Sequence, residues 1–321
     1  MNEGRGTLAS IAGRFASLIG VLAAVVVLYV VPPHAAITLL DLQTIAVHCI
    51  VVGIAAAGMT MVIISGGIDL SVGSQIALTS VVAALAMKAG WPLWAAAVAC
   101  VAAGSACGLY NGLLITVLRL PPFIATLGTL GFFRGVAKWV SESKPITAPT
   151  GGLERLVRQV PEQSWMVLAP GVWLLVGVCG VMAVRLRSTV LGRQAFAIGS
   201  NEEAAKRAGI KIGATKIKIY AIAGALAGIA GLMQFARVTQ GDPTISVGQE
   251  LDIIAAVVIG GASLSGGQGS VFGTLLGAFL MAYLRNRCTV LGWENYIQEM
   301  IVGHIIILAV AVDQWRRRKG R

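Results

Sequence analysis

Charged side chains are scarce in this chain. Only 12% of its 321 residues are Asp, Glu, Lys or Arg, whereas hydrophobic residues make up 56%. A soluble domain carries about 25% charged residues, so this composition excludes an ordinary soluble protein and indicates a membrane protein. A net charge of +11 would suggest nucleic-acid binding in a soluble protein. Here the cations gather at the ends of apolar runs, which indicates membrane orientation and lipid contact, with no nucleic acid as partner.

The chain also lacks the residue patterns of common catalytic and metal sites. It contains no HExxH motif, no GxSxG motif and no phosphate-binding GxxxxGK[ST] loop. Its three histidines are far apart, and no row of carboxylates or histidines suggests a proton relay. The five cysteines lie in or beside apolar runs without CxxC spacing, which indicates packing rather than disulfides or metal ligands. We therefore expect a protein that is not an enzyme and that has no cofactor and no metal site.

One short motif looks like part of a nucleotide site. Residues 264–268 read LSGGQ, the signature string of transporter ATPases. A nucleotide site would also need the phosphate-binding loop that the chain lacks, and the string lies between two apolar runs. We interpret it as a membrane turn and expect no ATP hydrolysis by this chain.

Apolar runs recur along the whole chain. A helix needs about 20 apolar residues to cross a bilayer; several runs approach that length, and length and helix breakers together indicate about ten spans. They lie at residues 15–31, 44–64, 72–87, 93–118, 123–140, 165–184, 219–236, 251–264, 271–284 and 296–312. Glycines four residues apart occur in several runs and allow membrane helices to approach closely. The sequence therefore predicts an all-α, polytopic transmembrane helix bundle of about ten spans with broken, glycine-rich segments.

Basic residues predict how this bundle is oriented. Many lysines and arginines lie in the loop 185–218 and at the C-terminal end, and such segments face the cytoplasm. An even number of spans then places the N-terminus inside as well, while Arg285 and Arg287 fall outside as a local violation of the rule. We expect one domain over residues 1–321: a first half (1–140), an outer loop (141–164) and a second half (165–321).

The basic loop contains a short helix whose two ends are marked. Ser200 or Asn201 can cap its start, and Gly209 follows as a left-handed stop. Its charges suit the helix dipole and lie four residues apart for pairing: Glu202 and Glu203 in the first turn, Lys206 and Arg207 in the last. Ala204 and Ala205 leave a smooth strip. A capped helix between membrane runs is expected to bind another protein.

Two glycine-rich turns share the pattern GGxxLSxG, at residues 66–73 and 260–267. Glycine-broken segments in the two halves of a membrane protein often mark the transport path, and polar groups inside spans are costly and frequently functional. Candidate path residues are Asp69, Ser71, Asn111, Ser263 and Ser265. With ten spans the two turns face the same side, which does not fit a simple inverted repeat. Other ionisable groups at or inside runs are Arg134, Asp252 and His304.

Three stretches carry a resemblance to a known family. They read GMTMVIISGGIDLSVGS (58–74), LGRQAFAIGSNEEAAKRAGI (191–210) and ELDIIAAVVIGGASLSGGQGSVFGTLLGA (250–278). In this order and spacing they resemble the membrane permease of ribose-type ABC sugar importers over nearly the whole chain. The familiar SGIDLS pattern departs here by one extra glycine at Gly66, and the second signature ends in the usual GGxG.

The resemblance implies a permease homodimer in a bacterial inner membrane, in contact with lipid. It also implies a cytoplasmic ATPase with two nucleotide-binding halves and a periplasmic sugar-binding protein. The helix at 201–210 would be the coupling helix. The residues expected to contact the ATPase are Asn201, Glu202, Glu203, Ala204, Ala205 and Gly209. Lys144, Arg155 and Arg158 of the outer loop are expected to pair with acidic residues of the binding protein.

The solute implied is a monosaccharide, with a ribose-like pentose favoured. An importer of the same kind for autoinducer-2, a deoxysugar or a nucleoside stays open, because no residue distinguishes these solutes. A stand-alone secondary transporter and a membrane-embedded enzyme are further alternatives. Uptake without an ATPase would indicate the first, and chemical modification of the solute would indicate the second.

Overall fold

The computed structural model describes residues 38–162 and 166–319, so the predicted first span (15–31) lies outside the described residues. The helices are α2 (Leu39–Ile64), α3 (Val72–Lys88), α4 (Leu93–Thr116), α5 (Pro122–Val140), α6 (Pro170–Ser188), α7 (Val190–Ser200), α8 (Glu202–Arg207), α9 (Ile212–Val238), α10 (Gln249–Ile259), α11 (Val271–Val290) and α12 (Asn295–Lys319). A 3-10 helix, η1 (Leu153–Leu156), and two short antiparallel strands, β1 (Ile146–Thr147) and β2 (Gln240–Gly241), complete these elements. The predicted all-α membrane bundle is confirmed.

Within the described residues, four helices are long and apolar enough to cross a membrane: α2, α4, α6 and α9. The remaining predicted runs in the described chain also form helices, with ends shifted by a few residues, and the total of about ten spans stays a prediction. The run 251–264 needs correction, because its helix, α10, ends at Ile259. Eleven residues give about 16 Å, roughly half of the hydrocarbon core. Gly260 and Gly261 end the helix, and Gly261 has a φ of +92°.

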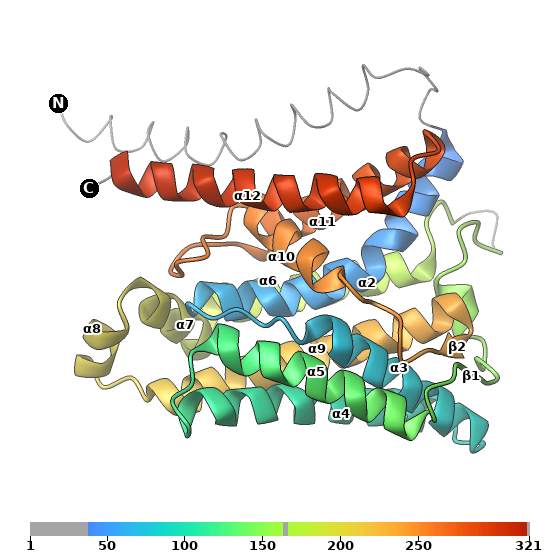
Figure 1. The fold of residues 1–321 in the computed structure, drawn as a ribbon, viewed down its shortest axis with the longest axis horizontal. Helices are drawn as coiled ribbons and strands as arrows, with labels where there is room; N and C mark the ends of the chain where they lie inside the picture. The colour runs from blue at the N-terminus through green and yellow to red at the C-terminus, as the bar shows by residue number, and fades with distance from the viewer. Residues whose placement is uncertain (1–37, 163–165, 320–321) are drawn as a thin grey trace.

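The long helix α9 is the centre of the bundle and packs against α4, α2 and α3 (Figure 1). Gly104 of α4 faces Gly224 of α9, and a Cβ atom on Gly104 would overlap the Gly224 carbonyl oxygen. The glycine spacing of α4 and α9 thus permits backbone contact, as predicted. The spacing in α5 differs, because an added Cβ at Gly131 or Gly135 meets no atom within 4 Å. The five cysteines are all free and buried.

The two ends of the bundle carry different elements. The helices α7 and α8 lie at one end, at the left of Figure 1, and the β1–β2 pair lies at the other. The strands pair Ile146 with Gly241 and Thr147 with Gln240, which attaches the predicted outer loop to the end of α9. The basic loop and the outer loop therefore lie at opposite ends of the bundle, as the distribution of lysine and arginine residues predicts.

Candidate functional site

The short helix α8 is capped at both ends as its sequence indicates. The side-chain oxygen of Asn201 accepts a 2.9 Å hydrogen bond from the backbone N–H of Ala204, so Asn201 is the N-cap. Ser200 is the last residue of α7 instead. Gly209 follows with a φ of +84°, and its N–H donates to the Lys206 carbonyl at 3.0 Å. The helix is shorter than the predicted 201–210 because these caps enclose only Glu202–Arg207.

The acidic start of α8 is attached to α9. The Lys216 ammonium lies 2.7 Å from a carboxylate oxygen of Glu202, and the Lys216 side chain is only 15% exposed. Within the described chain, neither predicted pair, Glu202/Lys206 nor Glu203/Arg207, forms an ion pair, so that prediction is wrong. The physical reason is that α9 begins only five residues after α8 ends and brings Lys216 beside the first turn.

The exposed surface of α8 is smaller than predicted. Asn201, Glu202, Glu203, Ala204 and Gly209 are exposed. Ala205 is only 5% exposed, so its methyl group packs against its own chain and offers no surface to a partner. One side of this six-residue helix packs on the bundle. Ala205 lies on that side, whereas Ala204 is exposed and remains available to a partner.

Immediately before α8, the chain rests on both glycine-rich turns. An added Cβ on Gly199 would overlap the Ile64 carbonyl oxygen at the end of α2, and it would lie 2.5 Å from the Gly267 nitrogen. A Cβ on Gly266 would lie 2.8 Å from the Gly199 carbonyl oxygen and 3.0 Å from the Gly66 Cα. We call these five residues, Ile64, Gly66, Gly199, Gly266 and Gly267, the glycine junction. It joins α7 and α8 to segments that lie about 130 residues before them and 70 residues after them.

The first turn leads into a buried polar network. Asp69 accepts hydrogen bonds from the backbone N–H and hydroxyl of Ser71, at 2.9 and 2.6 Å, and from the Gln75 amide at 3.0 Å. Asn111 of α4 donates to the Ser71 hydroxyl at 2.8 Å and approaches Asp69 at 3.4 Å. All four side chains are at most 3% exposed. The structure thus brings together three predicted path residues and adds Gln75.

The second turn is arranged differently. Ser263 is 1% exposed, and its backbone N–H donates to the Gln268 carbonyl at 3.2 Å. Ser265 is exposed, and its N–H lies 3.4 Å from the Ser263 hydroxyl. The two turns touch through the glycine junction, where the Gly267 N–H donates to the Ile64 carbonyl at 2.9 Å. The two glycine-rich turns therefore lie side by side, and each has its own polar groups.

The outer loop holds the three predicted docking residues at the surface. Lys144, Arg155 and Arg158 are exposed. Glu162 lies 2.8 Å from Arg158 and 3.8 Å from Arg155, so both guanidinium groups already share one carboxylate. The hydrogen bond from the Thr150 hydroxyl holds the pKa of the nearby Glu154 carboxyl below its ordinary value, and the two arginines act in the same direction.

Comparison with known proteins gives a family. Residues 42–310 match the model of the family described as branched-chain amino acid transport system / permease component. The chain belongs to this permease family. It is 37% identical over 299 residues to the ribose import permease protein RbsC of Escherichia coli K12, covering 92% of each chain. It is also 37% identical to RbsC of Bacillus subtilis over 82% of this chain and 81% of that protein. No solved structure shows a significant match.

A second group of relatives is named for a different solute. The permease is 32% identical over 314 residues to the L-arabinose transport system permease protein AraH of Escherichia coli K12, covering 96% of this chain and 94% of that protein. The matches to RbsC and AraH extend over nearly the whole permease, beyond the three stretches quoted from its sequence.

The LSGGQ string of the permease lies between α10 and α11, in the turn that contacts Gly199. Its glycines serve backbone contact there: Gly266 and Gly267 have φ values of +84° and +75°, and both approach the end of α7. This geometry agrees with a membrane turn.

The other ionisable groups have structural partners. Arg134 donates to the carbonyls of Pro243 and Ile245, at 2.8 and 2.6 Å. Asp252 forms a 2.6 Å ion pair with Arg285, which explains how an arginine is accommodated at this position of α11. His304 is exposed, and its ring lies 2.8 Å from the Met300 carbonyl. Among the described residues, no group of three or more metal-binding side chains occurs.

Two residues that make these contacts were not predicted from the sequence. Gln75 lies four residues after Ser71, on the same face of α3, and this helical spacing was an available signal. Lys216 lies 14 residues from Glu202, and no local rule relates positions at that distance.

Proposed function

We propose that this chain is the transmembrane permease subunit of an ABC importer that moves a monosaccharide into the cytoplasm, with D-ribose as the first candidate. The observation that carries the proposal is the match to ribose import permeases over 92% of both chains. The similarity to AraH makes L-arabinose the competing solute. Such an importer works with an ATPase and a substrate-binding protein, and the bacterial inner membrane is the place of the permease.

The coupling part of the proposal rests on α8. The exposed residues that we assign to ATPase contact are Asn201, Glu202, Glu203, Ala204 and Gly209. Ala205 is reassigned to the base of the helix because it is buried. The two caps and the Glu202–Lys216 ion pair hold α8 in a fixed position on α9, so a displacement of the helix by a partner would move the adjoining backbone as well.

The glycine junction gives that displacement a route into the bundle. Gly199 lies against both the end of α2 and the turn before α11. Protein interiors are close-packed and transmit movement with little compression. A shift of α7 and α8 would therefore act on both halves of the permease at once, without a long chain of side-chain contacts.

The buried polar network between α3 and α4 is assigned to the translocation path. Asp69, Ser71 and Asn111 are buried in one hydrogen-bonded network, so we assign them to a barrier that is closed in this conformation. Ser263 and Ser265 lie in the turn that the glycine junction connects to this barrier. Opening would separate α3 from α4 and expose polar groups that suit a hydroxylated solute.

On the opposite side, Lys144, Arg155 and Arg158 are proposed to meet acidic residues of the binding protein. We further propose that two copies of the permease form a homodimer and that lipid covers the remaining apolar surface. The exposed aromatic residues of α4 and α5, Tyr110 and Phe132, stack with ring centroids 5.6 Å apart and are available for either contact.

The test is reconstitution of the permease in proteoliposomes with its ATPase and its binding protein. Labelled D-ribose and L-arabinose are offered outside the vesicles, with and without ATP. We expect accumulation of unmodified pentose that needs ATP and both partner proteins. Uptake without the ATPase would indicate a secondary transporter, and absence of uptake of either pentose would refute the assigned solute class.

A further inference from the structure

A cavity of about 440 Å³ opens at the end of the bundle that carries the outer loop. Its lining residues are Val47, His48, Val157, Arg158, Gln159, Val160 and Arg237. Small-molecule sites in proteins have volumes of about 300–1,000 Å³, so the space suffices for a monosaccharide.

The position of the cavity suits a solute that arrives from outside. It lies between α2, α9 and the outer loop, and α2 and α9 are the two most buried of the four candidate spans. Arg237 belongs to the last turn of α9, whereas α8 adjoins the first turn of the same 27-residue helix. A helix of this length measures about 40 Å, so the cavity and the coupling helix are separated by the thickness of the membrane.

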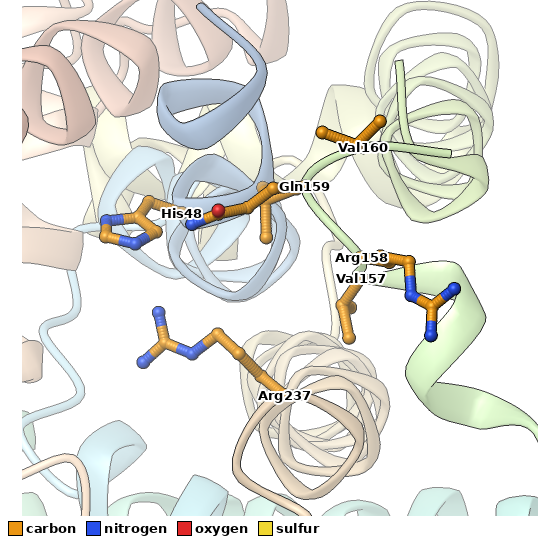
Figure 2. A pocket seen from close by; sticks show the side chains of 7 residues that line it. His48, Val157, Arg158, Gln159, Val160 and Arg237 are labelled. Atoms are coloured by element: carbon orange, nitrogen blue, oxygen red, sulfur yellow. The ribbon is translucent and has the colours of Figure 1, made fainter. Parts of the chain in front are cut away.

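Three polar side chains in the cavity have no partner within the described chain. No hydrogen bond or ion pair joins the side chain of His48, Gln159 or Arg237 to another described residue. Figure 2 shows the His48 ring and the Arg237 guanidinium extending from α2 and α9 into the same space, while Arg158 points away from it. Arg158 instead pairs with Glu162. A partly buried guanidinium without an acceptor is costly unless water or a ligand supplies one.

The chemistry of these groups fits hydroxyls. The guanidinium of Arg237 offers only donors, whereas the amide of Gln159 and a neutral imidazole of His48 each offer a donor and an acceptor. Hydroxyl groups also donate and accept, so a polyol can pair with all the donors and acceptors of Arg237, Gln159 and His48. A carboxylate accepts only and would leave the acceptors of Gln159 and His48 unused. The valines supply apolar walls for the C–H face of a sugar ring.

We propose that this cavity is a weak sugar-binding site of the permease itself, in which Arg237, His48 and Gln159 bind the hydroxyl groups of the solute. The inference rests on the proposed function, because the ligand class is that of the proposed solute. It adds a site to the outer face of the permease, where sugar released from the binding protein would pause before the barrier opens.

Binding is tested with the full-length permease in nanodiscs without its partners. Saturation-transfer NMR is recorded with D-ribose and with L-arabinose at about 10 mM, well above the Kd of a weak site. We expect transfer to at least one pentose with the wild type and its loss with Arg237→Met, which keeps the chain length but removes the donors. Lys138→Met is the matched control and should retain the signal. Lys138 is an exposed cation in the last turn of α5, at the end of the bundle that carries the outer loop.

Transport is tested in the reconstituted importer. Arg237→Met should lower pentose uptake about tenfold, the loss expected for one hydrogen bond to a charged group. The affinity of the binding protein for sugar should not change. Equal NMR signals for wild type and Arg237→Met, or no signal for the wild type, would overturn the site. Displacement of the sugar by acetate or phosphate would also overturn it, in favour of an anion site. Failure of the wild-type importer to take up pentose would refute the proposed solute independently.

Discussion

The backbone N–H of Gly267 donates a 2.9 Å hydrogen bond to the carbonyl oxygen of Ile64. These residues end two segments that the chain separates by about 200 positions, and Gly199 lies against both of them. The two repeated turns therefore meet each other immediately before α8, the proposed coupling helix. This contact is the structural basis for the idea that one helix acts on both halves of the permease.

The first prediction concerns the glycine junction. Gly199→Ala places a methyl group into the Ile64 carbonyl, and such overpacking costs about 1–3 kcal/mol. We expect the permease to remain in the membrane while ATP hydrolysis continues and sugar uptake falls. The measurement is the ratio of pentose taken up to ATP hydrolysed in proteoliposomes. Gly135→Ala is the control, because an added Cβ there meets nothing within 4 Å. An unchanged ratio for Gly199→Ala would refute the proposed route.

The second prediction concerns the end of α8. Gly209 has a φ of +84°, and a β-branched residue in this left-handed conformation costs about 1–2 kcal/mol. Gly209→Val should displace the exposed end of α8, and transport-stimulated ATP hydrolysis and uptake should both fall. Membrane insertion should be normal. Gly131→Val, in an open part of α5, controls for the substitution itself. Normal uptake by Gly209→Val would count against a coupling role for α8.

The third prediction concerns the buried network. Asp69→Asn replaces one carboxylate oxygen by an NH2 group, which cannot accept the hydrogen bond that Ser71 or Gln75 donates to that position. A buried donor that loses its acceptor costs about 1–3 kcal/mol, so we expect a lower unfolding temperature in detergent and reduced uptake. Glu142→Gln, an exposed carboxylate on the outer loop, should change neither. A variant with wild-type thermal stability and uptake would show that Asp69 neither holds the start of α3 nor forms part of the barrier.

The fourth prediction concerns docking of the binding protein. Because Glu162 already pairs with Arg158 and Arg155, Glu162→Gln should free both arginines and strengthen docking. Exposed ion pairs contribute about 0.2–1 kcal/mol, which corresponds to a change in Kd of at most about fivefold.

The measurement for this fourth prediction is surface plasmon resonance at about 50 and about 500 mM NaCl, where screening separates charge effects from other contacts. Reversal of charge at Arg155 and Arg158 should weaken docking mainly at low salt. If charge reversal leaves the low-salt Kd unchanged, these arginines do not bind the partner protein.

Local features of the fold were predictable from the sequence, because they depend on neighbouring residues. Asn201 and Gly209 mark the ends of α8 through capping and a left-handed turn. The broken segment at α10 follows from Gly260 and Gly261 in the same way, although the helix ends earlier than its apolar run. Apolar composition alone therefore overestimates how far a membrane helix extends.

Contacts between distant positions were not predictable. The pairing of Glu202 with Lys216, the approach of Gly199 to Ile64 and the proximity of His48 and Arg237 all depend on how whole helices pack. Small residues at regular spacing indicated that helices approach each other closely. They did not indicate which helix packs against which. Gly104 meets Gly224, whereas Gly131 meets nothing within the described chain.

The helix α9 carries Lys216, bound to Glu202, near one end, and it is followed at the other by the strand that pairs with the outer loop. A single stiff element therefore connects the two faces to which different proteins are proposed to bind. If nucleotide binding to the proposed ATPase shifts α9 and thereby changes the affinity of the outer face for the binding protein, docking of the binding protein must change the affinity for nucleotide by the same factor.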